Sequence, residues 1–267
     1  MSIITISRGT FSGGQILAEC VAKKLGYSCI SREIIVAAAR GRGVPLEELT
    51  KALNEPPGGL FHRKTLSRVH YLVYIREALV KTVKDEKAVY HGLAGQLLLI
   101  GVPHVLRVFV IANMEYRIQA AIERLHCNRG KAIEFINSID KKRDNWVRFL
   151  YNVDRHDPSL YDLIINLDRI DIDSACDIIC ASASQQEFQT TPESQKRLKD
   201  LVLAAEIRAM IASEGSIDDD SVEVEADNGV IILKGMAHSL ADADKIRQVV
   251  RQRVDVKDIK SEMHVKV

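Results

Sequence analysis

A glycine-rich stretch near the start of the sequence, SRGTFSGGQIL, has residue types that suit phosphate binding. Gly13 and Gly14 lack a Cβ, so their backbone amides can approach an anion closely. Ser7, Arg8 and Ser12 could add side-chain donors. An apolar run precedes the stretch and an amphipathic pattern follows it, which gives the order strand, glycine turn, helix. A helix that begins here directs the positive end of its dipole at the same anion. The stretch therefore predicts a phosphate-binding loop.

This loop departs from the usual phosphate-binding motif at two positions. The spacing from Gly9 to Gly14 fits G-x-x-x-x-G-K-[ST], but Gln15 replaces the lysine and Ile16 replaces the hydroxyl that holds magnesium. From the loop alone, a tight strand-to-helix turn without a ligand is an equally good interpretation. Residues elsewhere in the chain must decide between the two.

Strands and helices alternate over the first 182 residues and are expected to position the loop. Buried, β-branched runs predict strands at residues 3–7, 88–91, 105–111 and 163–167, and helical spacing of apolar residues predicts helices at 16–25, 63–84 and 114–126. Continuous apolar strands separated by helices are typical of a parallel sheet that helices cover on both faces. We therefore expect an α/β fold over residues 1–182.

The expected helix at 63–84 is rich in lysine and arginine. Its charged side is either a surface that closes over an acidic substrate or simply the solvated face of an amphipathic helix. The sequence PPGG at 56–59, just before this helix, predicts a hinge.

A polar segment at 183–195, which lacks periodicity and contains Pro192, predicts a linker. The pattern then changes to a helix, a strand with alternating polarity, a turn at Asn228-Gly229, a return strand, a helix capped by Ser239 with Asp242 at its third position, and a closing strand at 263–267. This order predicts a small αββαβ domain at 196–267.

The composition of the chain indicates an ordinary globular protein. The 267 residues are 46% hydrophobic and carry a formal net charge of +1, which argues against a disordered chain and against a general nucleic-acid binder. The N-terminus lacks the pattern of a secretory signal, and no apolar run is long enough to cross a bilayer. Five scattered cysteines are typical of a reducing compartment, and neither they nor the histidines have metal-ligand spacing. We therefore expect a cytoplasmic protein with no nucleic-acid partner.

Five pieces of the sequence occur in the order found in the cytidylate kinase-like family: SREIIVAAA, KAVYHGLAGQLLL, VLRVFVIANMEYRIQAAIERL, AIEFINSIDKKRDNW and YDLIINLDRIDIDSACDII. Together with the loop they resemble that family over residues 1–182. The resemblance implies a P-loop α/β fold related to nucleoside monophosphate kinases, with ATP and magnesium as cofactors and a nucleoside monophosphate as acceptor.

The resemblance also implies roles for individual residues. The positions on the ATP side are Ser12, Gly13, Gly14 and Gln15 in the loop, and Arg117 and Arg124 on the helix after the third of the expected strands, where they would flank the donor nucleotide. Arg32 would face the acceptor monophosphate. Asp140 and Arg143 match the lid-like segment, where arginine would close over the transferring phosphoryl group because its planar fork binds phosphate oxygens bidentately.

Each of these assignments has a structural alternative. Arg117 and Arg124 are seven residues apart, so they share the face of a helix that is often merely solvated. Arg143 is spaced to pair with Asp140 at i,i+3.

Three positions bear on catalysis, although many members of the family already lack the usual loop lysine. Ser31 replaces the aspartate of the D-R-E-I motif, Leu93 replaces an arginine that would contact the acceptor phosphate, and Gln15 replaces a charge on the donor side. Loss of one donor to the transition state typically slows such a reaction about 10²–10³-fold, whereas binding depends less on any single charge. The two hypotheses are a weak ATP-dependent nucleoside monophosphate kinase and a non-catalytic nucleotide sensor.

The segment DDDSVEVEADNGVIILKGMAHSLADADKIRQVVRQRV and the final MHVKV resemble a BON domain over residues 196–267. This resemblance implies a module that binds phospholipid or a small ligand. A regulatory or homo-oligomerising module is the alternative.

Overall fold

The structure is a computed structural model, and it describes residues 2–33, 37, 62–85, 87–214, 217 and 221–265. The predicted hinge at 56–59 lies outside the described residues. The described chain divides into two compact units. The N-terminal unit holds the described residues up to 33 and those from 85 to 191, and the C-terminal unit holds residue 37, residues 62–84 and those from 192 to 265.

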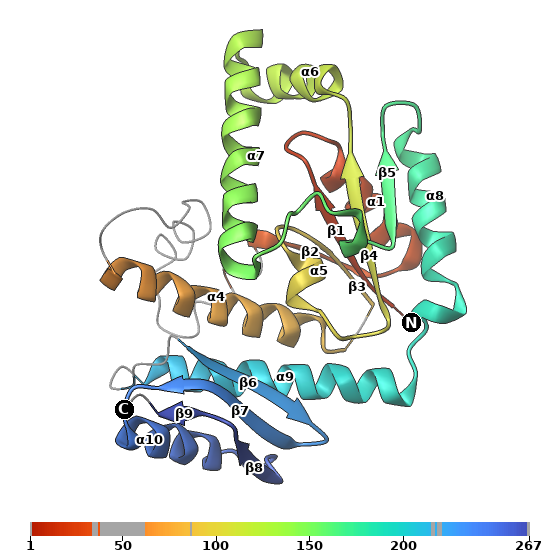
Figure 1. Cartoon of the computed structure of the whole chain (residues 1–267). Coiled ribbons are helices and arrows are strands. Elements are labelled where there is room, and N and C mark those ends of the chain that lie inside the picture. The colour runs from red at the N-terminus through yellow and green to blue at the C-terminus, as the bar shows by residue number, and fades with distance from the viewer. Residues whose placement is uncertain are drawn as a thin grey trace. The chain divides into compact units, whose positions relative to one another are not determined.

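A five-stranded parallel sheet forms the centre of the N-terminal unit (Figure 1). Its strands, in the order β2-β3-β1-β4-β5 across the sheet, are β2 Ser28–Ser31, β3 Ala88–His91, β1 Ile3–Arg8, β4 Val105–Ile111 and β5 Leu163–Asn166. Ile3 of β1 lies opposite Ala88 on one side and Val105 on the other. The predicted parallel α/β sheet is confirmed. β2 was not among the predicted strands, because its sequence SCIS is polar and only half buried.

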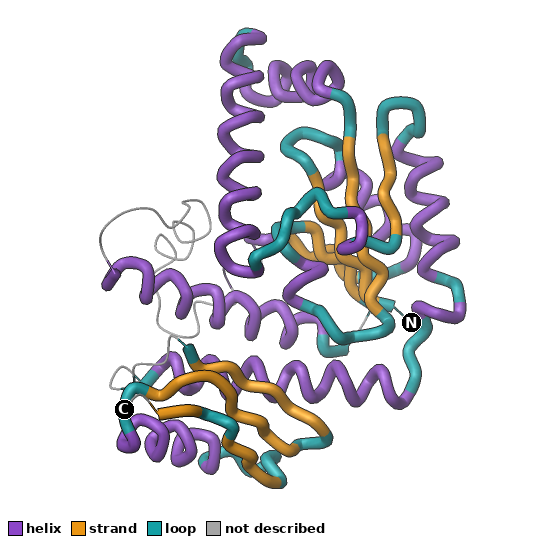
Figure 2. Tube along the Cα trace, in the orientation of Figure 1, coloured by secondary structure: helices purple, strands orange, loops and turns teal. Residues whose placement is uncertain are grey.

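Helices cover both faces of this sheet (Figure 2). The helices of this unit are α1 Gly14–Leu25, α5 Gly95–Leu98, α6 Met114–Leu125, α7 Arg129–Tyr151 and α8 Ile172–Ala183, with short 3-10 turns η2 Pro158–Leu160 and η3 Gln186–Phe188. Helix α6 packs against α7. Alternation along β1 sends Ile4 and Ile6 into a core shared with α1 and α8. Thr5 points to the opposite face, where it lies against Gly95 of α5.

The carboxyl ends of the parallel strands meet at one edge of the sheet. β1 runs from there into α1, and β4 and β5 run into α6 and α8. In open α/β sheets, ligands bind in the crevice outside this edge. The glycine loop lies there.

The C-terminal unit contains a second, small sheet. Its elements are α4 His62–Val83, α9 Pro192–Ser213, β6 Val222–Asp227, β7 Val230–Ala237, α10 Leu240–Arg251, β8 Asp258–Ser261 and β9 His264–Val265. β6 and β7 are antiparallel, while β8 and β9 both pair with β7 in parallel.

The predicted details of this small sheet hold where the structure describes them. Asn228 and Gly229 have φ of 54° and 79°, the positive values that a tight hairpin turn needs. The Oγ of Ser239 accepts a hydrogen bond from the amide of Asp242 at 3.0 Å and caps α10. β8 is an additional strand that was not predicted, and residues 266–267 of the expected closing strand lie outside the described part.

Helix α4 lies between β2 and β3 in the sequence but belongs to the C-terminal unit. It packs along α9, where the hydroxyls of Tyr74 and Ser213 are 3.5 Å apart. The ammonium of Lys81 lies 3.3 Å from a carboxylate oxygen of Glu206 on α9. α9 begins at Pro192, so its first turn and η3 both fall within the segment 183–195 that was predicted as a linker.

Within the described ranges, no helix is long and apolar enough to span a membrane.

Candidate functional site

The glycine loop joins the end of β1 to the start of α1. Gly13 adopts φ 81° at the position before the helix, where no side chain caps the helix and the first turn carries no acidic residue. In the part of the chain that the structure describes, the amides of Gly13 and Gly14 donate no hydrogen bond. Amides without a protein acceptor at an uncapped helix N-terminus are well suited to an anion. Gly13 is half-buried and Gly14 is buried, and the amides of both remain without an acceptor among the described residues, at the position expected for a phosphate.

Ser12, in contrast, supports the loop from inside. Its side chain is buried, and its hydroxyl lies 3.0 Å from the carbonyl oxygen of Gly9 and 3.2 Å from that of Val110. Its amide donates to the same Gly9 carbonyl at 3.3 Å. Ser12 thus fixes the shape of the loop, and its hydroxyl is engaged by the protein.

Neither Gln15 nor Ile16 supplies the positive charge or the hydroxyl that the usual motif has at these two positions. The Gln15 side-chain amide donates to a carboxylate oxygen of Glu19, one helical turn further on, at 3.0 Å. Ile16 is 58% exposed and places an apolar side chain where the motif has a hydroxyl.

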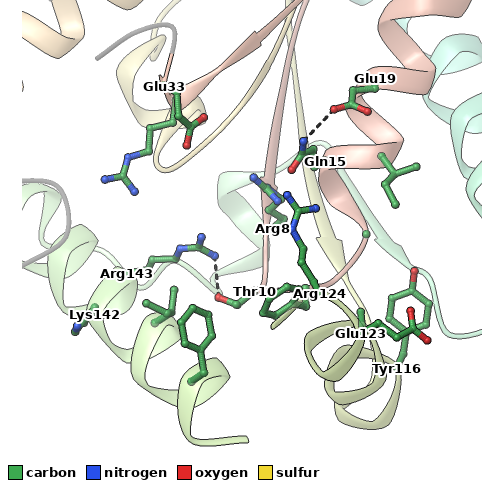
Figure 3. Close-up of a pocket in the computed structure, with 17 residues that line it drawn as sticks. Arg8, Thr10, Gln15, Glu19, Glu33, Tyr116, Glu123, Arg124, Lys142 and Arg143 are labelled. Carbon is green, nitrogen blue, oxygen red and sulfur yellow. Dashed lines mark hydrogen bonds between the residues drawn. The ribbon is translucent and has the colours of Figure 1, made fainter. Parts of the chain in front are cut away.

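A cleft of about 1040 Å³ opens beside the loop. Its walls come from β1, the loop, α1, α6 and α7, as the labelled side chains in Figure 3 show. One part is apolar, where the rings of Phe11 and Phe135 are 6.0 Å apart. The charged side chains that line it are Arg8, Glu19, Arg32, Glu33, Glu123, Arg124, Lys142 and Arg143. The cleft has both the size and the mixed character of a small-molecule site.

Asp140 and Arg117 hold the loop in place through hydrogen bonds to Thr10. The Asp140 carboxylate accepts hydrogen bonds from the amide and the hydroxyl of Thr10, at 3.1 and 2.7 Å, and from the Arg117 guanidinium. Arg117 also donates to the Thr10 carbonyl oxygen at 2.8 Å. Burial alone would raise the pKa of Asp140, but the bonds from Thr10 and Arg117 outweigh it and hold the pKa below its usual value. Asp140 is therefore an ionised anchor of the loop.

Arg143 reaches the cleft from α7. It donates to the Thr10 hydroxyl at 3.0 Å and lies 3.9 Å from Asp140, so the i,i+3 pair that the sequence suggested is present. Burial, followed by the nearby positive charge of Arg8, lowers the pKa of Arg143 to about 10. Arg143 is still protonated at neutral pH and stands over the loop as a partly desolvated cation.

A second, smaller cavity of about 70 Å³ adjoins the cleft. Arg8, Arg32, Glu33 and Arg143 line both spaces. Leu93 lines the smaller one, which places an apolar side chain where the family pattern has an arginine.

Arg155 also lines this small cavity and was not predicted from the sequence. It is buried, donates to Asp144 at 2.8 Å, and donates to the carbonyl oxygen of Arg8 at 3.2 Å. It thereby ties the end of β1 to α7. Its loop has no periodicity, so the sequence carries no signal that this arginine turns inward.

The residues present fit the phosphates of a nucleotide, because the glycine loop has amides to which the described residues offer no acceptor, and several arginines line the cleft beside it. Magnesium at nucleotide sites usually binds one or two protein oxygens together with the phosphates and water, so it needs no cage made of protein side chains alone. Within the described ranges, no group of three or more His, Cys, Asp or Glu is placed to hold a metal ion, and Asp140 is already bonded to Thr10 and Arg117.

The predicted site residues thus divide into two sets. Those that line the cleft are Gly13, Gln15, Arg32, Arg124 and Arg143, and those that shape or support the loop are Ser12, Gly14, Arg117 and Asp140.

Comparison with known proteins finds two matching protein families, a curated relative and solved structures with a similar fold. The model of the cytidylate kinase-like family matches residues 3–169, and that of the BON domain matches residues 199–267. A cytidylate kinase from Methanothrix thermoacetophila is 26% identical over 171 residues, which cover 63% of this chain and 90% of that protein. The crystal structure of an uncharacterized protein from Eubacterium ventriosum has a TM-score of 0.54 and 19% identity, covering 70% of this chain and all of that one. This structural likeness shows the fold alone.

Proposed function

The chain belongs to the cytidylate kinase-like family, and from that premise we propose that its cleft binds a nucleoside triphosphate and a nucleoside monophosphate and slowly transfers a phosphoryl group between them. The observation that carries the proposal is the glycine loop itself, whose Gly13 and Gly14 amides are available at an uncapped helix start. ATP is the donor that the family suggests.

The arrangement supports a division of the site between donor and acceptor. The loop amides would hold the donor phosphates, with Arg124 on the cleft wall beside them. Arg32 would hold the acceptor phosphate, because it lines the smaller cavity as well as the cleft. Arg143 lines both spaces and would neutralise charge between them. An acceptor phosphate oxygen would form the new bond to the terminal phosphorus as the bond to the ADP leaving group breaks.

Three substitutions support a slow transfer. Gln15 is bonded to Glu19, Ile16 offers no hydroxyl, and Leu93 offers no charge to the acceptor. Each lost donor typically slows phosphoryl or acyl transfer about 10²–10³-fold. We expect binding to survive these losses, because the backbone amides remain.

Calorimetric titration with ATP, CMP and AMP, run beside a coupled kinase assay, tests the proposal. We expect binding of a nucleotide with turnover far below an ordinary kinase rate of about 1–100 s⁻¹. Turnover within that range would contradict the slow transfer, and absence of binding by every nucleotide would contradict the nucleotide site.

A non-catalytic nucleotide sensor is the second candidate function. The observation that favours it is Asp140, whose carboxylate is engaged by Thr10 and Arg117 instead of being available as a base. The BON-like unit would then bind a phospholipid or small ligand, or form a homo-oligomer, and report the nucleotide state in the cytoplasm. Flotation of the full chain with liposomes, with and without ATP, separates the membrane role from the others.

A further inference from the structure

Arg8, the last residue of β1, packs directly on the glycine loop. A Cβ placed on Gly14 would lie 2.8 Å from both Cβ and Cδ of Arg8. The aliphatic stem of Arg8 therefore occupies the space that a side chain at position 14 would need. Gly14 is required here so that Arg8 can cross the start of α1.

The stem carries the Arg8 guanidinium over the helix start to the boundary between the two cavities. Arg8 lines the cleft and also the smaller cavity. One of its terminal nitrogens lies 3.5 Å from Nδ1 of His91, at the end of β3. Figure 3 shows Arg8 and Arg124 extending into the same part of the cleft, beside Gln15.

The Arg8 charge is not neutralised within the described part of the chain. None of the ion pairs among the described residues involves Arg8, and Glu33 and Glu19 act on it only through charge–charge attraction without a hydrogen bond. Burial lowers the pKa of Arg8, which records the cost of withdrawing this charge from water. A half-buried cation without a carboxylate partner, next to Arg32, Arg124 and Arg143, indicates a site that an anion completes.

We propose that Arg8 is the phosphate-binding cation of this loop and takes the role that the motif gives to the lysine at position 15. The cation reaches the phosphates from the end of β1, across Gly14, instead of from the first turn of α1. The inference rests on the proposed nucleotide site and deepens it. Arg8 would replace the positive charge that is missing at Gln15. The hydroxyl missing at Ile16 and the charge missing at Leu93 are not replaced.

The test removes the charge at position 8 and restores one at position 15. Arg8→Met keeps an unbranched stem over Gly14 but has no charge, and Arg8→Gln is a second neutral variant. The double variant Arg8→Met with Gln15→Lys supplies the usual lysine. Lys23→Gln removes one positive charge from the exposed, opposite end of α1 and is the matched control. Each full-length protein is titrated with ATP and with adenosine by calorimetry, after its thermal unfolding has been compared with that of the wild type.

We expect Arg8→Met to weaken ATP binding about 10–100-fold, as loss of charge-assisted hydrogen bonds does, and to leave adenosine binding unchanged. The double variant Arg8→Met with Gln15→Lys should bind ATP at least tenfold more tightly than Arg8→Met alone. Lys23→Gln should bind ATP as the wild type does. Unchanged ATP affinity in both neutral variants, an equal loss for adenosine, or failure of the lysine to rescue would each overturn the role of Arg8. Failure of the wild type to bind any nucleotide would instead overturn the proposed function.

Discussion

At the residue scale, the contact between Gly14 and Arg8 explains why glycine stands at that position. The first atom of any larger side chain would overlap the Cβ of Arg8, which cannot move without its backbone. Glycine is needed at position 13 for a different reason, because its φ of 81° would strain the backbone of any other residue. The two glycines therefore serve separate purposes in one loop.

Gly14→Ala should displace Arg8 and weaken ATP binding by roughly tenfold or more, because the guanidinium loses its position. Gly130→Ala is the matched control, since a Cβ on Gly130 would meet only Oδ1 of Asn128, at 3.5 Å, near the start of α7. Calorimetry of both variants with ATP measures the difference. Equal ATP affinity in the two variants would contradict the steric role of Gly14.

Asp140 gives a prediction about stability and pH. Its folded pKa is depressed, so its contribution is fully present above the unfolded pKa of about 3.9 and is lost as the pH falls through the folded value. Asp140→Asn should therefore lower the free energy of unfolding at pH 7 by about 1–3 kcal/mol, and this difference should shrink below about pH 4.

Trp146 provides the signal for this measurement. It is the only tryptophan of the chain and is buried in α7 of the N-terminal unit. Urea titrations followed by its fluorescence report on the unit that contains Asp140. A difference between wild type and variant that stays constant from pH 7 to pH 3 would show that the Asp140 charge does not stabilise the loop.

At the element scale, most of the N-terminal sheet could be predicted from the sequence, because β1, β3 and β4 are continuous apolar runs. β2 could not, since SCIS is a short polar strand at the edge of the sheet. The sequence also suggested Arg8 as a possible donor beside the glycine loop, and a second signal supports it. Alternation along β1 places position 8 on the same face as Ile4 and Ile6, which α1 covers.

Other features of the site depend on tertiary contacts that spacing does not encode. The sequence showed that Asp140 and Arg143 can pair, but not that Thr10 and Arg117 bond to the same carboxylate. It also gave no sign that the Ser12 hydroxyl turns toward the carbonyl of Val110. Side chains separated by about 100 residues meet only after the sheet is assembled.

Asp200 of α9 leads to a prediction about the small sheet. Its buried carboxylate accepts hydrogen bonds from the amides of Asn228 and Gly229, at 3.0 and 3.2 Å, and so anchors the β6–β7 turn. Asp200→Ala should lower the free energy of unfolding by about 1–3 kcal/mol, because two partly buried amides lose their charged acceptor. Hydrogen exchange should become faster in β6 and β7, and unchanged exchange in these strands would contradict the anchoring role.

At the scale of the whole molecule, the order of elements along the chain differs from their grouping in space. α4 follows β2 in the sequence, yet its Tyr74 and Lys81 contact Ser213 and Glu206 of α9. Amphipathic spacing predicts that a helix has a buried face but does not say which element covers it. The domain limits of 1–182 and 196–267 therefore remain a prediction from the sequence, while the described C-terminal unit includes α4.

A chain limited to residues 192–267 should be less stable than the same residues in the full protein, because α9 loses the partner that α4 provides. Hydrogen exchange of the α9 amides, measured in both chains, tests this expectation. Equal protection of α9 in the two chains would show that α4 contributes nothing to the unit.

The central claim is that the amides of Gly13 and Gly14, which have no acceptor in the described part of the protein, hold the phosphates of a nucleotide. The most direct test is the amide NMR spectrum of the full chain, with the signals of Gly13 and Gly14 followed during titration with ATP and, separately, with adenosine. We predict that both signals shift on addition of ATP and stay in place with adenosine. Binding of ATP that leaves both signals unmoved would contradict the claim.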